Sequence, residues 1–292
     1  MPHQTIWLNG ELVDREHATV SVYDHGLLYG DGCFEGIRAY NGRIFKLESH
    51  LDRMERSAEK LRLTPAFSRE AIRDAIRRTL DANGLTDGYI RLIYTRGAGT
   101  LGLHPFRCET PGTIIIADSI QLYPKELYEQ GMHVIVARRP RIPAQCLDPS
   151  VKSLNYLNNI LAKVDAIDAG VLEAIMLNYE GHVAECTGDN IFAVRNGRLV
   201  TPPPEAGILL GITRQFVIDE LAPSCGLEVE QRLFRLDELL DADEVFLTGT
   251  AAEIIGVSRI DDRVIGSGVV GPVTAQLIEA FRSRVAREAP EN

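Results

Sequence analysis

The feature that most constrains the fold is an alternation of short apolar strands and amphipathic helices along the whole chain. TIWLNGELV and GIRAYNGRIFKL each place Asn-Gly between apolar alternations, which predicts strands in β-hairpins across the first ~45 residues. Helices are expected through HLDRMERSAEKL and from Ser68 to Asn83-Gly84, and strands return in GYIRLIYTR and GTIIIAD. Residues 1–118 are therefore predicted to form a small N-terminal α+β domain.

The remainder of the chain predicts a second, larger domain. The polar stretch 119–131 carries a proline and interrupts the apolar runs, so we expect an interdomain linker there. In residues 132–292, many short strand patterns are interspersed with helix patterns near 213–222 and 272–287, which indicates a curled or barrel-like sheet. Two domains also suit a length of 292 residues better than one.

Composition excludes several classes of protein. The net charge of −10, with no basic stripe, argues against binding to nucleic acid. The five cysteines contain no C-x-x-C pair, which argues against a disulfide framework and a zinc site, so no metal is expected. Neither a signal sequence nor a membrane span is recognisable, and we expect a cytoplasmic protein.

A glycine cluster raises one rival function. Gly97, Gly99 and Gly102 have the G-x-G-x-x-G spacing of a dinucleotide site, which suggests an NAD-dependent oxidoreductase. Such a turn has to open a helix, whereas Pro105 and Pro111 follow closely. The segment is therefore predicted to be a loop.

Lys152 is the residue on which a chemical reading depends. Leu154, Leu157, Leu161 and Val164 follow it at helical spacing and predict a buried apolar stripe, with the amine just ahead of the first turn. A lysine whose charge is suppressed by burial can attack a carbonyl, such as that of pyridoxal phosphate (PLP). On this segment alone a surface lysine is the commoner case, since most lysines at helix starts reach water.

Two turns of small residues favour anion binding. In LLGITRQFVIDEL, Gly211 lets the backbone approach a ligand where Ile212 and Thr213 begin a helix, although a simple N-cap at Thr213 explains the same pattern. In TGTAAEI, the hydroxyl of Thr250 and the amides of Thr250 and Ala251 can form an anion-binding nest, or merely a turn.

Glu185 ends a short apolar strand in EGHVAECTGDNIF, where a carboxylate can point into a cleft. A PLP enzyme needs such an acid, because it keeps the pyridine nitrogen protonated. A single glutamate at a strand end is more commonly solvated.

Taken together, seven segments resemble one family over nearly the whole chain, the branched-chain amino acid aminotransferases among the fold type IV PLP-dependent enzymes. The segments are YGDGCFEGIR, HLDRMERSA, YIR, KSLNYLNN, EGHVAECTGDNIF, LLGITR and TGTAAEI. The resemblance implies a small N-terminal α/β sandwich domain followed by a larger C-terminal pseudo-barrel α/β domain. Cys186, in a position where many relatives have glycine or alanine, and the loop 97–105 depart from the family pattern.

The resemblance implies a role for each cofactor-binding residue. Lys152 would form a Schiff base with PLP and move the proton between the substrate Cα and C4′. Tyr156 would donate to the ring oxygen, and Glu185 would face the ring nitrogen. The residues implied for the phosphate are Arg53, Gly211, Ile212, Thr213 and Thr250, of which Arg53 otherwise looks like a solvated helix arginine.

For the substrate, the resemblance implies an apolar pocket with cationic groups within reach. The pocket residues are Tyr29, Phe34 and Tyr89, the amides of Thr250 and Ala251 would meet the α-carboxylate, and Arg91 would pair with the distal carboxylate of glutamate or 2-oxoglutarate, with Arg96 as a second guanidinium. A mostly apolar pocket with one guanidinium within reach explains how a single site accepts both aliphatic and acidic side chains. Without the resemblance, the aromatic residues would be read as core.

The implied activity is ping-pong transamination of leucine, isoleucine or valine with 2-oxoglutarate, in a homodimer or higher homo-oligomer. A D-amino-acid aminotransferase and an aminodeoxychorismate lyase share the equivalents of Lys152 and Glu185 and remain alternatives, although FEGIR and YIR favour the branched-chain enzymes. A binding protein that keeps the fold without turnover is a further alternative.

Overall fold

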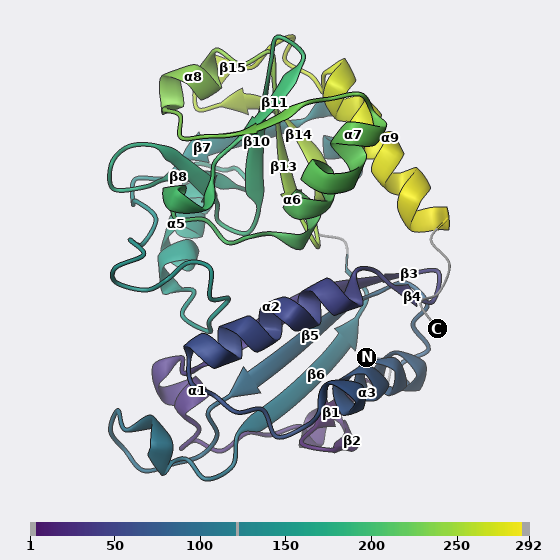
Figure 1. Ribbon diagram of the computed structural model, residues 1–292, viewed down its shortest axis with the longest axis vertical. Helices are drawn as coiled ribbons and strands as arrows, with labels where there is room; N and C mark the ends of the chain where they lie inside the picture. The colour runs from purple at the N-terminus through teal and green to yellow at the C-terminus, as the bar shows by residue number, and fades with distance from the viewer. Residues whose placement is uncertain (1–3, 121–122, 288–292) are drawn as a thin grey trace. The chain divides into compact units, whose positions relative to one another are not determined.

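The computed structural model describes residues 4–120 and 123–287. The chain divides into two compact units (Figure 1). Residues 4–120 and the short segment Val151–Asn155 form the first unit, and residues 123–150 and Tyr156–Arg287 form the second. The segment that contains Lys152 is thus counted with the first unit, whereas the sequence placed it in the second.

The first unit is built on a six-stranded sheet in the order β2-β1-β6-β5-β3-β4, with antiparallel neighbours throughout the described residues. Its strands are β1 (Thr5–Leu8), β2 (Glu11–Asp14), β3 (Gly32–Tyr40), β4 (Arg43–Ile44), β5 (Gly88–Thr95) and β6 (Gly112–Asp118). The helices α2 (Leu47–Lys60) and α3 (Arg69–Ala82) lie over the sheet (Figure 1). Both hairpins and both helices confirm the prediction.

Alternation along the two central strands decides what faces the helices. Cys33 and Ile37 of β3, with Ile90 and Leu92 of β5, belong to the core that includes Leu51 and Met54 of α2 and Ile72 and Ile76 of α3. Because successive side chains of a strand point to opposite faces, Phe34, Gly36, Tyr89 and Arg91 share the other face. That face is where the candidate substrate residues lie.

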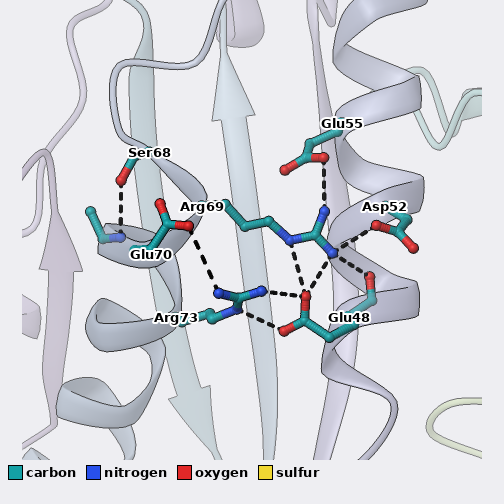
Figure 2. Close-up of polar contacts among 8 residues, drawn as sticks. Glu48, Asp52, Glu55, Ser68, Arg69, Glu70 and Arg73 are labelled. Carbon is teal, nitrogen blue, oxygen red and sulfur yellow. Dashed lines mark hydrogen bonds and ion pairs between the residues drawn. The ribbon is translucent and has the colours of Figure 1, made fainter.

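A network of ion pairs joins α2 to α3 (Figure 2). Glu48 accepts hydrogen bonds from Arg69 and Arg73, and Arg69 also bonds to Asp52 and Glu55. Individual exposed pairs of this kind contribute little, but a shared network fixes how the helices pack. Since Glu48, Asp52 and Glu55 lie on one face of α2, another face is left for the site.

The second unit contains a nine-stranded sheet within its described residues. The order is β12-β11-β10-β13-β14-β7-β8-β9, with β15 paired to β14, and the pairs β11–β12, β14–β7 and β7–β8 are parallel. The strands are β7 (Met132–Val136), β8 (Ala174–Leu177), β9 (Val183–Cys186), β10 (Asn190–Arg195), β11 (Arg198–Thr201), β12 (Val229–Gln231), β13 (Glu244–Gly249), β14 (Glu253–Ile260) and β15 (Arg263–Val264). Figure 1 shows this sheet strongly twisted, as expected for a sheet that curls on itself.

The helices of the second unit include the two predicted near residues 213–222 and 272–287. The α-helices in the described residues of this unit are α4 (Leu127–Gln130), α5 (Leu157–Asp168), α6 (Ile212–Phe216), α7 (Ala222–Ser224), α8 (Leu236–Leu240) and α9 (Pro272–Arg287). A π-helical turn (Val217–Leu221) lies between α6 and α7. The stretch 119–131 expected as a linker contains α4, and its residues 121 and 122 lie outside the described ones. None of the described helices is long and apolar enough to cross a membrane.

The predicted apolar stripe after Lys152 is wrong. Helix α5 begins at Leu157, five residues beyond Lys152, and its buried face consists of Asn159, Ala162, Asp165 and Ala166. Leu157 is 66% exposed and Val164 is 42% exposed. Small and polar residues face the sheet because they allow close approach and hydrogen bonding, and periodicity of large apolar residues cannot reveal such a face.

The first 45 residues also contain a helix that the sequence did not predict. Helix α1 (His25–Tyr29) is capped by Asp24, whose Oδ1 accepts from Gly26 N at 2.7 Å, and it ends at Gly30 in the left-handed conformation (φ 69°). A single turn closed by its own cap leaves too short a pattern for periodicity to detect.

Candidate active site

The main chain around Lys152 is held against β3 by an isolated β-bridge and two hydrogen bonds in the first unit. Phe34 N donates to Lys152 O at 2.9 Å, Leu154 N donates to Gly32 O at 2.9 Å, and Cys33 forms an antiparallel bridge with Ser153. Lys152 N donates to Ser57 Oγ of α2 at 3.2 Å. The lysine is therefore fixed between β3 and α2, with its side chain half-buried.

The side chain of Lys152 lies over an aromatic ring. Its Nζ is 4.7 Å from the centroid of the Phe34 ring. Phe34 itself is buried, at 7% exposure. The amine thus has one apolar wall, and the main chain that carries it is fixed.

Arg53 is not the solvated helix arginine that its sequence suggested. It is 4% exposed and makes a bidentate pair with Glu35, from Nε to Oε1 at 2.7 Å and from Nη2 to Oε2 at 2.8 Å. His50 Nδ1 lies 2.7 Å from the same Oε2. Helix α2 therefore presents His50, Arg53 and Ser57 at helical spacing toward β3 and the lysine segment.

Burial and charge set the protonation of this cluster. Burial by itself raises the pKa of Glu35, but the charge and hydrogen bonds of Arg53, together with His50, lower it from 4.5 to about 2. Burial lowers the pKa of His50, and the Glu35 carboxylate only partly opposes this shift. At neutral pH, His50 is then a neutral donor through Nδ1, and Glu35 is ionised.

The candidate substrate residues of β3 and β5 form one cluster. The Arg91 guanidinium carbon lies 4.5 Å from the centroid of Phe34 and 5.6 Å from that of Tyr89, and Arg91 Nη2 donates to Tyr89 Oη at 3.3 Å. Gly36 makes room for this arrangement, since a Cβ at that position would lie 2.0 Å from Tyr89 Oη. The structure thus brings together three of the predicted residues.

Tyr29 and Arg96 have structural partners. Tyr29 Oη accepts from Gly102 N at 2.9 Å, so it is joined to the glycine-rich loop. Arg96 is 7% exposed, pairs with Asp31 through Nε and Nη2, and donates to the carbonyls of Leu61 and Arg62. Four of its hydrogen bonds are thus internal, which argues for Arg91 as the guanidinium that meets an acidic substrate.

In the second unit, Glu185 is buried within a ring of donors. Its Oε1 accepts from Arg141 Nε at 2.7 Å, and its Oε2 accepts from Leu209 N at 2.9 Å and Asn190 Nδ2 at 3.3 Å. Glu185 is 5% exposed and Arg141 is 7% exposed. A carboxylate held by three donors is fixed in direction, as an acid that faces a ring nitrogen has to be.

The two small-residue turns lie next to Glu185. Asn190 is opposite Thr248 in the pairing of β10 with β13, and Asn190 Nδ2 donates to Leu209 O at 2.9 Å. A Cβ on Gly211 would lie 2.0 Å from Asn190 Oδ1, and one on Gly249 would lie 1.9 Å from Asp189 Oδ1. Only glycine allows both turns to pack so closely on the turn after Glu185.

The other predicted residues have the following positions. Helix α6 begins at Ile212 with Gly211 as its N-cap, so the alternative of a simple N-cap at Thr213 is wrong. Thr250 and Ala251 are half-buried between β13 and β14, and Tyr156 is half-buried at the N-cap of α5. Burial raises the pKa of the Cys186 thiol well above its usual value, which makes it an inert core residue.

The glycine-rich loop does not open an α-helix. Strand β5 ends at Thr95, and the next regular element is a 3-10 turn, Pro105–Arg107. A dinucleotide site of the Rossmann type requires a helix at this position. The expectation of a loop is confirmed, and the NAD-dependent alternative loses its structural basis.

Four residues of the site escaped the sequence reasoning: Glu35, His50, Arg141 and Asn190. Glu35 and Arg141 contact partners that lie 15 to 44 positions away in the sequence, so no local spacing of residues indicates these contacts. Asn190, His50 and Glu35 did lie inside segments already singled out, EGHVAECTGDNIF, HLDRMERSA and YGDGCFEGIR. A polar side chain within an apolar strand or helix face was the available signal.

A charged groove of about 890 Å³ lies elsewhere in the first unit, along α2 and α3. Its lining includes Leu47, Glu48, Arg73 and Arg77, and none of the predicted site residues. Across residues 4–120 and 123–287, no three His, Cys, Asp or Glu side chains gather in a way that could hold a metal ion.

A model of the class IV amino-transferase family matches residues 32–260 of the chain. The chain belongs to this family, whose members depend on PLP, and the fold type IV architecture predicted from the sequence is confirmed.

Individual relatives narrow the comparison. The branched-chain-amino-acid aminotransferase of Escherichia coli (strain K12) is 36% identical over 282 residues, which cover 94% of this chain and 91% of the relative. A protein of Methanocaldococcus jannaschii is 50% identical over 277 residues, 95% of each chain. The solved structure of the branched-chain amino acid aminotransferase from Thermobaculum terrenum in its PLP form superposes with a TM-score of 0.88, at 34% identity, over 98% of this chain and 95% of that one.

Proposed function

We propose that this chain is a PLP-dependent aminotransferase that moves the amino group of leucine, isoleucine or valine to 2-oxoglutarate. The observation that carries the proposal is the pair of prepared groups. Lys152 is fixed by its main chain in the first unit, and Glu185 is buried among three donors in the second. An amine and an oriented carboxylate are what the two ends of the cofactor ring require.

The residues fit the cofactor by the chemistry of their donors. Glu185, which is held by Arg141, is assigned to the ring nitrogen, and Tyr156 is assigned to the ring oxygen. The phosphate is assigned to Arg53 and to the turns that contain Gly211, Ile212, Thr213 and Thr250, since turns of small residues offer main-chain amides to an anion. When bound, PLP supplies an aldehyde for the amine and a protonated ring that accepts the electron pair released at the substrate Cα.

The chain's own residues perform the proton transfer. Lys152 Nζ would take the proton from the substrate Cα and would return it at C4′, since it is the amine next to the reacting carbon. The reverse sequence with 2-oxoglutarate regenerates the starting enzyme, which gives ping-pong kinetics. The ring of Phe34 beside Nζ keeps one side of the amine dry.

The substrate pocket follows from the β3–β5 cluster. Phe34, Tyr89 and Tyr29 supply apolar surface for an aliphatic side chain, and the Arg91 guanidinium lies over the rings of Phe34 and Tyr89. An acidic substrate would pair with Arg91 once its side chain extends past the rings. The amides of Thr250 and Ala251 are assigned to the α-carboxylate.

We also propose a homodimer or larger homo-oligomer in the cytoplasm. Large apolar side chains are exposed on helix α1 and on the glycine-rich loop, among them Leu27 (62%), Leu101 (70%) and Leu103 (80%). Exposed apolar side chains of this kind are typical of surfaces through which proteins associate. All five cysteines are free thiols, which suits a reducing compartment.

The test of the proposed function supplies L-leucine, D-alanine and aminodeoxychorismate separately to the purified protein with PLP. We expect turnover of L-leucine with 2-oxoglutarate as acceptor. Activity confined to D-alanine or aminodeoxychorismate would replace the proposal with one of the two related enzymes. A protein that binds PLP but turns over none of the three would be a binding protein.

A further inference from the structure

The buried cluster of Glu35, His50 and Arg53 is larger than phosphate binding by one arginine requires. Arg53 and His50 gather around the Glu35 carboxylate in the first unit, and all three side chains are at most 4% exposed. Burying charge in this way costs free energy that apolar residues of similar size would not cost. The cluster therefore calls for a function beyond stability.

The geometry of the pair fixes the plane of the arginine. Glu35 grips Arg53 through Nε and Nη2, at 2.7 and 2.8 Å, so the guanidinium cannot rotate about its last bonds without breaking a hydrogen bond. His50 Nδ1 holds the Glu35 carboxylate in turn, at 2.7 Å from Oε2. The Nη1 end of the guanidinium is thereby given one direction.

The same helix anchors the lysine. Ser57, four residues after Arg53 on α2, accepts from Lys152 N, and Glu35 neighbours Phe34, whose N donates to Lys152 O. The arginine that meets the phosphate and the amine that meets the aldehyde are thus registered to one another through β3 and α2. The phosphate end and the aldehyde end of bound PLP would therefore depend on the same contacts between β3 and α2.

We propose that Glu35 is a positioning residue, which orients Arg53 toward the phosphate of the bound cofactor while His50 holds Glu35 in place. The proposal rests on the proposed function, since it presumes that PLP is the ligand. Glu35 touches neither cofactor nor substrate in this role and acts only through Arg53.

The proposal predicts an effect that depends on the phosphate. Glu35→Gln keeps the shape of the side chain but replaces one accepting oxygen with a donor, which faces Arg53 or His50 and loosens the pair. We expect the Kd for PLP, measured by equilibrium dialysis, to rise by about ten- to a hundredfold, the range for one charge-assisted hydrogen bond. The Kd for pyridoxal, which has no phosphate, should change less than about threefold by the same reasoning.

A matched control lies on the same helix. Glu48→Gln makes the same chemical change and also disrupts pairs with two arginines, Arg69 and Arg73, but on the face of α2 that is joined to α3 (Figure 2). We expect it to leave the Kd for both ligands unchanged. An equal loss of PLP affinity in this control would mean that any disturbance of α2 suffices, and would overturn the assigned role.

A double-mutant cycle tests whether Glu35 acts through Arg53. In an Arg53→Lys background, which retains the charge but lacks the fork, Glu35→Gln should cause little further loss of PLP affinity. Additive losses would contradict the proposal. If Glu35→Gln does not yield folded protein, Glu35→Asp retracts the carboxylate with its charge kept, and the same PLP-selective loss is expected; wild-type affinity in that variant would refute the role.

The outcomes separate this proposal from the proposed function. A wild-type protein that binds neither PLP nor pyridoxal would defeat the function itself. A wild-type protein that binds PLP, with variants that weaken PLP and pyridoxal equally, would defeat only the role of Glu35.

Discussion

Gly36→Ala is expected to damage the recognition of acidic substrates through a single added methyl group. The new Cβ would lie 2.0 Å from Tyr89 Oη and 2.7 Å from Tyr89 Cζ, whereas ordinary contact begins at 3.4 Å. The tyrosine ring therefore has to withdraw, because Gly36 and Tyr89 lie on the same face of neighbouring strands. Its withdrawal takes away the hydrogen bond and the ring contact of Arg91.

The magnitude follows from those two contacts. The hydrogen bond contributes about 0.5–1.5 kcal/mol and the cation–π contact about 0.5–1 kcal/mol at a partly exposed site. Together they amount to roughly 1–2.5 kcal/mol, which corresponds to about a five- to seventyfold loss in kcat/KM. The loss should be larger for L-glutamate than for L-leucine, because only the acidic substrate relies on Arg91.

The assay is the half-reaction of each amino acid with the PLP form, followed by stopped-flow absorbance. Tyr89→Phe is the matched comparison, since it removes the hydroxyl that bonds to Arg91 without crowding the strand. The double variant Gly36→Ala/Tyr89→Val clears the collision and should recover the melting temperature lost in Gly36→Ala. Wild-type kinetics with glutamate and an unchanged melting temperature in Gly36→Ala would show that the added methyl group does not displace Tyr89.

Acidification should destabilise the protein as pH falls from 4.5 toward 2, because the pKa of Glu35 is lowered to about 2 in the folded state and the unfolded state takes up the proton first. The loss in the free energy of unfolding is on the order of 3 kcal/mol. Urea unfolding measures it, and a free energy of unfolding that does not change below pH 4.5 would contradict the prediction. Arg96→Lys should lower the melting temperature and leave the ratio of glutamate to leucine activity unchanged, since Arg96 is engaged by Asp31 and two carbonyls; a selective loss with glutamate would return it to the substrate site. Ala162→Leu should destabilise by about 1–3 kcal/mol through overpacking of a fully buried position, as thermal unfolding would show, and a neutral effect would mean that α5 packs differently.

Local signals predicted much of the fold. Asn9-Gly10 and Asn41-Gly42 adopt the positive φ angles that a tight hairpin requires, and the sequence placed both turns. Ser68 caps α3 through Ala71 N, as its position before an apolar pattern indicated. Such features depend on neighbours along the chain, and sequence alone therefore suffices to find them.

Features set by distant contacts were missed or misread. The buried face of α5 depends on what the helix packs against, and it proved to be Ala162, Ala166 and two polar residues rather than leucines. Strand β14 was not predicted, because its first two residues were read as the end of a turn of small residues, although it pairs with both β13 and β7. Whether a segment is a strand depends on the neighbours that it pairs with.

In the candidate site, too, local features were predicted and distant contacts were missed. The sequence segments around Lys152 and Glu185 predicted these two residues, but not the side chains that hold them in place. Arg141 and Glu35 contact their partners across 44 and 18 residues. The roles assigned to Arg53, Tyr156 and Arg91 came from resemblance, and they stay predictions that ligand binding has to test.

Reduction of the PLP-loaded protein with borohydride, followed by peptide mapping, tests directly whether Lys152 is the lysine that binds the cofactor. The chain has five lysines, at positions 46, 60, 125, 152 and 163. We predict a single pyridoxyl label, on the peptide that contains Lys152, because this lysine is fixed by its main chain between β3 and α2 beside Phe34. A label on any other lysine, or no label on a protein that has been supplied with PLP, would contradict the account.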